Sequence, residues 1–359
     1  MSGADDPVLP PAGFPPVQIG AEARPPTVVT PDCRTMFARR ARRFRDLASD
    51  HQLAPWLRFL GDLSEAQHVI QTGLPSPLLP AADAIARSIK FGQPVLPRMP
   101  FGPDPTILET INLLLEHLPG IAMPDPARAA LDRLRDAAGF PHQVQAVPHG
   151  CQDGNGGESP GGDATRLADD RAGEPDESAL PALPSMPELT ILSCIEAVLT
   201  DSIPVDSIAE HVFIGAALQV HFARAAALLD ATRLNFIGDG VCPVCGAPPA
   251  TSGIVGWGGA DRTRFCTCSL CGTRWNAVRV KCLACSSTKG IHYQSIEGQA
   301  HTIKAECCDE CRTFVKIMAE DEDPSLEPIA DDVASLGLDL LVLDSGYRRA
   351  GMNLFLLGT

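Results

Sequence analysis

Four Cys-x-x-Cys pairs lie in the C-terminal half of the chain, and cysteine sulfurs paired in this way are typical metal ligands. The pairs form a tandem copy, because each cysteine of the first two pairs is followed by another 40 residues later, and both copies read C-x2-C-x22-C-x2-C. Two such turns can complete a tetrahedron with metal–sulfur distances of about 2.3 Å. The predicted ligands are Cys242, Cys245, Cys268, Cys271, Cys282, Cys285, Cys308 and Cys311.

The spacing alone leaves open how the pairs combine and which metal they hold. Sequential grouping, first pair with second and third with fourth, is favoured over crossed grouping because each unit then closes locally with less loop entropy. Four thiolates in a tetrahedron suit zinc and a single rubredoxin-type iron alike. Two metal ions per chain are therefore expected, in sites that are structural or redox-active and not hydrolytic.

The residue after each second cysteine predicts a difference between the two copies. Gly246 and Gly272 stand there in the first copy and accommodate the left-handed backbone that such a turn often needs. Ser286 and Arg312 stand there in the second copy. The turns of the second copy are therefore expected to be more strained.

Other cysteines and histidines are not expected to be primary ligands. Cys266 and Cys307 lie beside ligand pairs but break the 40-residue repeat, although a spare thiol next to Cys308 could act in redox chemistry or replace a ligand. Isolated cysteines are small apolar residues by default, and a histidine is surplus where four thiols fill a site. This group comprises Cys33, Cys151, Cys194, His292 and His301.

Composition limits the classes of function. The 359 residues carry a net charge of -15, which argues against general nucleic-acid affinity, because phosphate binding needs clustered cations. The metal region is locally basic, with nine Lys and Arg against five Asp and Glu between Val241 and Met318. The most apolar stretch, Ile208 to Leu229, contains charged residues and is expected to be a buried helix. Residues 1–31 lack the apolar segment of a secretory signal, which favours the cytoplasm.

Periodicity predicts an α+β multidomain protein. Helical patterns fill the first half, and strand-like alternation appears at Arg274–Val280 and Thr313–Ile317 between the cysteine pairs, as in rubredoxin-like or zinc-ribbon modules. The expected parts are a Pro-rich flexible leader (1–31), a helical domain (32–148), a Gly/Asp-rich disordered insert or linker (149–186), a helical continuation (187–238), metal ribbon 1 (239–280), metal ribbon 2 (281–322), and a C-terminal helix and tail (323–359).

Two predicted helices carry conspicuous charges. In Arg34–Ser49 the arginines are expected to form a solvated cationic face, with a docking surface for an acidic partner as the alternative. A single C-terminal helix is expected from Leu326 to about Leu343, with an apolar face. Its Asp331 and Asp332 are expected to face water, with a partner contact as the alternative.

Several stretches resemble the FdhE family of formate dehydrogenase accessory proteins. The specific stretches cover most of residues 240–340, and a weaker one covers Phe37 to Ile70. The specific stretches are CPVCGAPP (242–249), CSLCGTRW (268–275), RVKCLAC (279–285), IKAECCDECRTFVKI (303–317) and DPSLEPIADDVASLGLD (323–339).

This resemblance implies a cytoplasmic assembly factor and not an enzyme. Proteins of this family are required for active formate dehydrogenase and contact its molybdenum- or tungsten-containing catalytic subunit. The resemblance also implies that the eight paired cysteines bind two metals in rubredoxin-like sites, with iron or zinc. The chain departs from the family pattern in the 150–178 insert, the Pro-rich leader and the extra cysteines, none of which removes a ligand.

Two other classes of function compete with this interpretation. A rubredoxin-like electron carrier would require iron in the sites. A zinc-ribbon nucleic-acid binder would use the basic residues of the metal region, and its binding would weaken steeply with salt. Membrane insertion is not expected, and the oligomeric state is left open.

Overall fold

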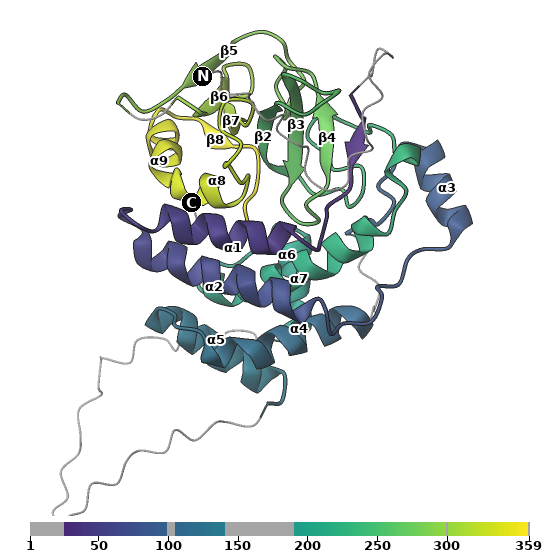
Figure 1. The fold of residues 1–359 in the computed structure, drawn as a ribbon, viewed down its shortest axis with the longest axis vertical. Helices are drawn as coiled ribbons and strands as arrows, with labels where there is room; N and C mark the ends of the chain where they lie inside the picture. The colour runs from purple at the N-terminus through teal and green to yellow at the C-terminus, as the bar shows by residue number, and fades with distance from the viewer. Residues whose placement is uncertain (1–24, 99–104, 141–189, 299–300, 358–359) are drawn as a thin grey trace, which may run out of the picture.

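The computed structural model describes residues 25–98, 105–140, 190–298 and 301–357. Within these residues a layer of helices lies against a cysteine-bearing sheet, and the C-terminal helices flank that sheet (Figure 1). Most of the leader and the predicted insert at 149–186 lie outside the described residues. In the described part of the chain, no helix is long and apolar enough to cross a bilayer.

The first half is helical, as the periodicity predicts. The predicted buried helix is α7, whose side chains are nearly all buried, and α4, α5 and α6 pack against it while α1 packs on α2. The helices are α1 (Met36–Leu47), α2 (Ala54–Ile70), α3 (Ala82–Lys90), α4 (Pro105–His117), α5 (Asp125–Ala137), α6 (Ile191–Leu199), α7 (Ile208–Ala227), α8 (Ala330–Ala334) and α9 (Leu336–Asp344), with 3-10 turns η1 (Leu118–Gly120) and η2 (Ala231–Arg233).

The cysteine region forms one eight-stranded sheet in the order β1-β4-β3-β2-β7-β6-β5, with β8 paired to β7. Each ribbon supplies three consecutive antiparallel strands, β2 to β4 and β5 to β7. The strands are β1 (Val28–Val29), β2 (Pro249–Val255), β3 (Thr263–Cys268), β4 (Arg274–Ala277), β5 (Ile291–Gln294), β6 (Ile303–Cys308), β7 (Thr313–Ala319) and β8 (Arg348–Arg349).

The two ribbons join through a parallel pair in which the first strand of one meets the last strand of the other. Ser252 of β2 lies opposite Ile317 of β7, and Ile254 lies opposite Ala319. Strand β2 is therefore paired on both sides, whereas the corresponding strand of ribbon 2, β5, is an edge of the sheet. The sequence duplication thus produces two unequal surroundings.

Two of the five arginines of α1 are withdrawn from the expected solvated face, whereas Arg39, Arg42 and Arg45 are exposed. Arg40 is only 3% exposed and its guanidinium binds Glu327 and the side-chain oxygen of Gln219. Arg43 binds Asp331 with two hydrogen bonds of 2.6 and 2.8 Å. These acids come from the C-terminal segment, nearly 290 residues away along the chain, and local periodicity cannot reveal such distant partners.

The prediction that Asp331 and Asp332 face water is wrong, since both are buried. The predicted single helix is also divided, into α8 and α9 around Ser335. The ammonium group of Lys316 on β7 donates to the backbone oxygens of Asp332 and Ser335, at 2.8 and 3.0 Å. The Lys316 side chain thus occupies backbone carbonyls that a continuous helix would use for its own i to i+4 hydrogen bonds.

Candidate metal centres

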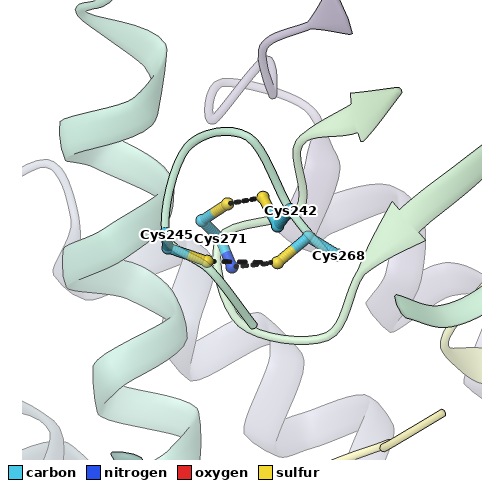
Figure 2. Close-up of side chains that lie close together, drawn as sticks. All are labelled: Cys242, Cys245, Cys268 and Cys271. Atoms are coloured by element: carbon cyan, nitrogen blue, oxygen red, sulfur yellow. Dashed lines mark hydrogen bonds between the residues drawn. The ribbon is translucent and has the colours of Figure 1, made fainter. Parts of the chain in front are cut away.

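The four cysteines of ribbon 1 gather around one point, with the sulfurs turned toward one another (Figure 2). The Sγ atoms of Cys242 and Cys271 are 3.6 Å apart, and those of Cys245 and Cys268 are 3.4 Å apart. The first pair lies in the turn before β2, and the second begins at the last residue of β3. Antiparallel pairing of β2 with β3 brings these two turns together.

Ribbon 2 repeats this arrangement. Its four cysteines also gather within the ribbon, with 3.6 Å between the sulfurs of Cys282 and Cys311 and 3.7 Å between those of Cys285 and Cys308. Among the described residues, neither cluster contains a cysteine of the other ribbon. The first cysteine pair is therefore grouped with the second, and the third with the fourth.

Both sulfur sets have the dimensions of a tetrathiolate site. A tetrahedron with metal–sulfur distances of about 2.3 Å has edges of about 3.8 Å between sulfurs, and the closest sulfur pairs lie 3.4 to 3.7 Å apart. Backbone N–H groups also point at sulfur, as in the 3.4 Å bonds from Leu270 and Cys271 to Cys268. Such donors stabilise thiolates, the form of cysteine that binds metal.

All four turns adopt the left-handed backbone anticipated for the residue after the second cysteine. The φ angles are 79° at Gly246 and 71° at Gly272, and 61° at Ser286 and 55° at Arg312. Glycine adopts this conformation without steric cost, whereas a residue with a Cβ atom is strained there. The strain predicted for the second copy is thus present at both of its turns.

The helical layer covers the first centre. The backbone N–H groups of Leu96 and Arg98, after α3, donate to the carbonyls of Val244 and Cys245 at 2.7 and 3.1 Å. From α7, the Gln219 amide donates to the carbonyl of Ser269 at 2.8 Å. The four cysteines of this centre are no more than 1% exposed and belong to the main apolar core.

The second centre is open to solvent on one side. Cys285 is exposed and Cys311 is partly exposed, while Cys282 and Cys308 are 5% and 2% exposed. This centre contacts ribbon 1 through the hydroxyl of Ser286, which donates to the carboxylate of Asp239 at 2.7 Å. Equal ligand spacing therefore produces one enclosed centre and one accessible centre.

Two threonines contact the sulfurs, and the sequence analysis missed both. The Thr273 hydroxyl lies 3.1 Å from Sγ of Cys271, and the Thr313 hydroxyl lies 3.0 Å from Sγ of Cys311. These threonines are 40 residues apart, so the repeat itself, read as C-x-x-C-x-T, carried the signal. Although burial opposes it, hydrogen bonds from Thr313 and the neighbouring cysteines lower the pKa of Cys311 to about 7.

Comparison with known proteins places this architecture in a family. Models described as FdhE, N-terminal, FdhE, central domain and FdhE, C-terminal domain match residues 25–147 with 165–239, 241–279 and 280–356. The chain belongs to the FdhE family. The FdhE models thus cover both the helical layer and the two ribbons.

Relatives and a solved structure agree with this assignment. The FdhE homologue of Rhizobium meliloti is 37% identical over 345 residues, covering 96% of this chain and 97% of its own. Protein FdhE of Escherichia coli is 31% identical over 338 residues, covering 92% and 91%. The crystal structure of the FdhE protein from Pseudomonas aeruginosa superposes with a TM-score of 0.69 at 25% identity, covering 93% of this chain and 99% of that one.

The extra thiols of this FdhE-family chain lie outside both sulfur clusters. Cys266 and Cys307 have no exposed surface, and burial raises the pKa of their thiols to about 12 and about 11. Cys194 is buried in the helical core, and Cys33 is half-buried, with its pKa raised to about 12 by burial. Cys151 lies outside the described residues.

The histidines between the last two pairs are also separate from the sulfurs. His292 lies 3.6 Å from the Asp309 carboxylate and packs edge-on against the Tyr347 ring. His301 lines a cleft at the junction of the ribbons. Among the described residues, the potential metal-binding groups are the two cysteine sets.

Proposed function

We propose that this chain is an accessory protein for formate dehydrogenase. It binds the catalytic subunit in the cytoplasm, supports assembly of the active enzyme and is not itself an enzyme. The observation that carries the proposal is the family match along the whole architecture, with 96% of the chain aligned to the Rhizobium meliloti homologue. A match that spans the helical layer and both ribbons supports the role that the FdhE resemblance implies.

The two cysteine sets support a structural or redox contribution. Each would hold one metal ion, iron or zinc, through Cys242, Cys245, Cys268 and Cys271 or through Cys282, Cys285, Cys308 and Cys311. The bound metal would cross-link its two turns and, if it is iron, supply one-electron chemistry. Catalytic zinc sites keep a position for water or substrate, whereas four thiolates fill the tetrahedron.

A deletion experiment tests the assembly role. Removing this chain from its host is expected to abolish formate oxidation, and restoring it on a plasmid is expected to recover the activity. Tagged protein should also co-purify the catalytic subunit from the complemented strain. Full formate oxidation in the deletion strain would contradict the proposal.

The accessibility of the second centre favours one other candidate function, a rubredoxin-like electron carrier. Electron exchange requires a metal site near the surface, and exposed Cys285 would place the second metal there. This function needs iron, so anaerobic purification followed by metal analysis and an absorbance spectrum tests it. A colourless protein that contains only zinc rules it out.

A further inference from the structure

A cleft of about 300 Å³ opens where the two ribbons meet, away from both sulfur clusters. Its lining combines Arg262 and Arg279 of ribbon 1 with Tyr293 and Lys304 of ribbon 2. The floor includes ends of the parallel strands β2 and β7. Because both ribbons contribute, the cleft exists only once the sheet has joined them.

Three cationic side chains of the cleft have no acidic partner among the described residues. Arg262, Arg279 and Lys304 form no ion pair with any residue in the described ranges, although most other arginines of the sheet do. The whole chain carries a net charge of -15. Although Asp321 and Glu322 also line the cleft, the three cations outnumber them, so an acidic partner would be repelled by most of this molecule and attracted at this position.

The backbone is strained where it presents one of these cations. Arg262 has a φ of 53°, and its N–H donates to the carbonyl of Val255 at 2.7 Å, which closes the loop between β2 and β3. Glycine would relieve this strain, and the loop does not belong to a cysteine pair.

A buried charge network holds the walls of the cleft in place. The Arg264 guanidinium donates to Glu306 at 2.8 Å, and the Tyr293 hydroxyl donates to the other oxygen of Glu306 at 3.0 Å. The same guanidinium donates at 3.3 Å to the carbonyl oxygens of Val278, Arg279 and Lys281. The segment that carries Arg279 and the strand that carries Tyr293 are thereby anchored to one buried ion pair, which preorganises the cleft.

Exposed apolar side chains accompany the cations. Val278, Val280 and Tyr293 are 56%, 49% and 44% exposed, and the latter two line the cleft itself. Apolar surface next to unpaired cations is suited to a polypeptide ligand that offers apolar side chains between carboxylates.

We propose that this cleft binds an acidic segment of a partner polypeptide, with its carboxylates on Arg262, Arg279 and Lys304 and an apolar side chain against Val280 and Tyr293. Two carboxylates, Asp321 and Glu322, also line the cleft. They can accept hydrogen bonds from peptide N–H groups, which the phosphates of a nucleic-acid backbone do not offer.

Fluorescence anisotropy with a labelled synthetic peptide that alternates Glu and Val tests the proposal on the full metal-loaded chain. Saturable binding tighter than about 1 mM is expected, weakening as salt rises from about 50 to 500 mM. The double variant Arg279→Gln/Lys304→Gln should weaken binding about fivefold to tenfold. The matched control Arg42→Gln/Arg58→Gln removes two exposed arginines of the helical layer that likewise have no ion pair among the described residues, and it should bind as the wild type does.

Several results would overturn the proposal. One is that the labelled peptide does not bind at peptide or protein concentrations up to about 1 mM. Another is that a peptide with Gln in place of Glu binds with equal affinity. A third is that the control variant loses as much affinity for the peptide as Arg279→Gln/Lys304→Gln does. Displacement of the peptide by inorganic phosphate or by a single-stranded oligonucleotide at lower concentrations would assign the cleft to another ligand. Unchanged melting temperature and metal content in both double variants establish that folding is intact. The experiment needs no formate dehydrogenase, so its failure leaves the proposed function unaffected.

Discussion

At the scale of single residues, the glycines of the first centre have two roles. Gly272 has the left-handed backbone that the turn requires, and a Cβ atom there would lie 2.6 Å from the sulfur of Met36 on α1. At Gly246 a Cβ atom would lie 3.0 Å from the ring of Pro94. Glycine therefore permits close contact with the helical layer as well as the turn, which explains why the second centre tolerates Ser286 and Arg312.

Replacing Gly272 with alanine is expected to destabilise the protein by about 2–3 kcal/mol, because the left-handed conformation costs about 1–2 kcal/mol and the flexible Met36 side chain must move to relieve the overlap. Gly92 provides a matched control, since its φ is 62° and a Cβ atom there would meet nothing within 4 Å. Gly92→Ala should cost only the conformational part, about 1–2 kcal/mol. Denaturant unfolding of the metal-loaded proteins measures both. Equal losses in the two variants would contradict a packing role for Gly272.

At the scale of elements, a buried cluster of charges fastens the C-terminal helices to the sheet. Lys316 of β7 and Arg349 of β8 both pair with Asp332 of α8 and Asp339 of α9. Asn353 donates to Asp332 at 2.9 Å as a further partner. Removing one member leaves an uncompensated buried charge, which costs far more than the loss of an exposed pair.

The variant Asp332→Asn is therefore expected to destabilise the protein by about 3–5 kcal/mol at neutral pH. Asp344→Asn is the control, because Asp344 is exposed at the end of α9 and forms no ion pair within the described residues. Chemical denaturation of both variants provides the measurement. A loss below about 1 kcal/mol for Asp332→Asn would show that the cluster contributes no more than a surface pair.

The same carboxylate predicts a pH dependence. Burial raises the pKa of Asp332, but Arg349, Lys316 and Asn353 outweigh that effect and hold the pKa below its usual 3.8. Because the pKa is depressed in the folded state, the stabilisation is complete above the unfolded value and is lost as the pH falls through the folded value. The stability difference between wild type and Asp332→Asn should therefore shrink only below about pH 4.

At the scale of the whole molecule, the two four-cysteine clusters differ in their surroundings and not in the cysteines that they offer as ligands. The helices cover the first, whose sulfurs lie in the main apolar core, while the second lies near the sheet edge formed by β5. A buried site releases metal only when the surrounding core opens, which is rare in a stable domain. An exposed ligand such as Cys285 can be attacked directly.

Metal release to an excess of chelator is therefore expected in two phases, with one equivalent lost at least tenfold faster than the other. Cys311→Ser should release one metal, unfold the second ribbon and remove the fast phase, while the slow equivalent remains. Cys307→Ala is the control, since this buried cysteine lies outside both clusters, and it should retain two metals. A single phase for the wild type, or two retained metals in Cys311→Ser, would contradict this assignment.

The sequence by itself determined the local features of this protein. The 40-residue repeat indicated two four-cysteine groups, and the apolar composition of Ile208 to Leu229 predicted the buried helix α7. The residue after each second cysteine predicted where the left-handed strain would lie. These features depend on residues close together in the chain, so their spacing is visible without the fold.

Only the tertiary structure decided how the parts meet. The parallel pairing of β2 with β7 created the cleft between the ribbons and left β5 as an edge, although the two sequence copies are alike in spacing. The burial of Asp331 and Asp332 likewise depends on Arg43, far away in the sequence, and on Lys316 and Arg349, which lie on separate strands. Partners of this kind come together only through strand pairing and helix packing, which residue spacing does not encode.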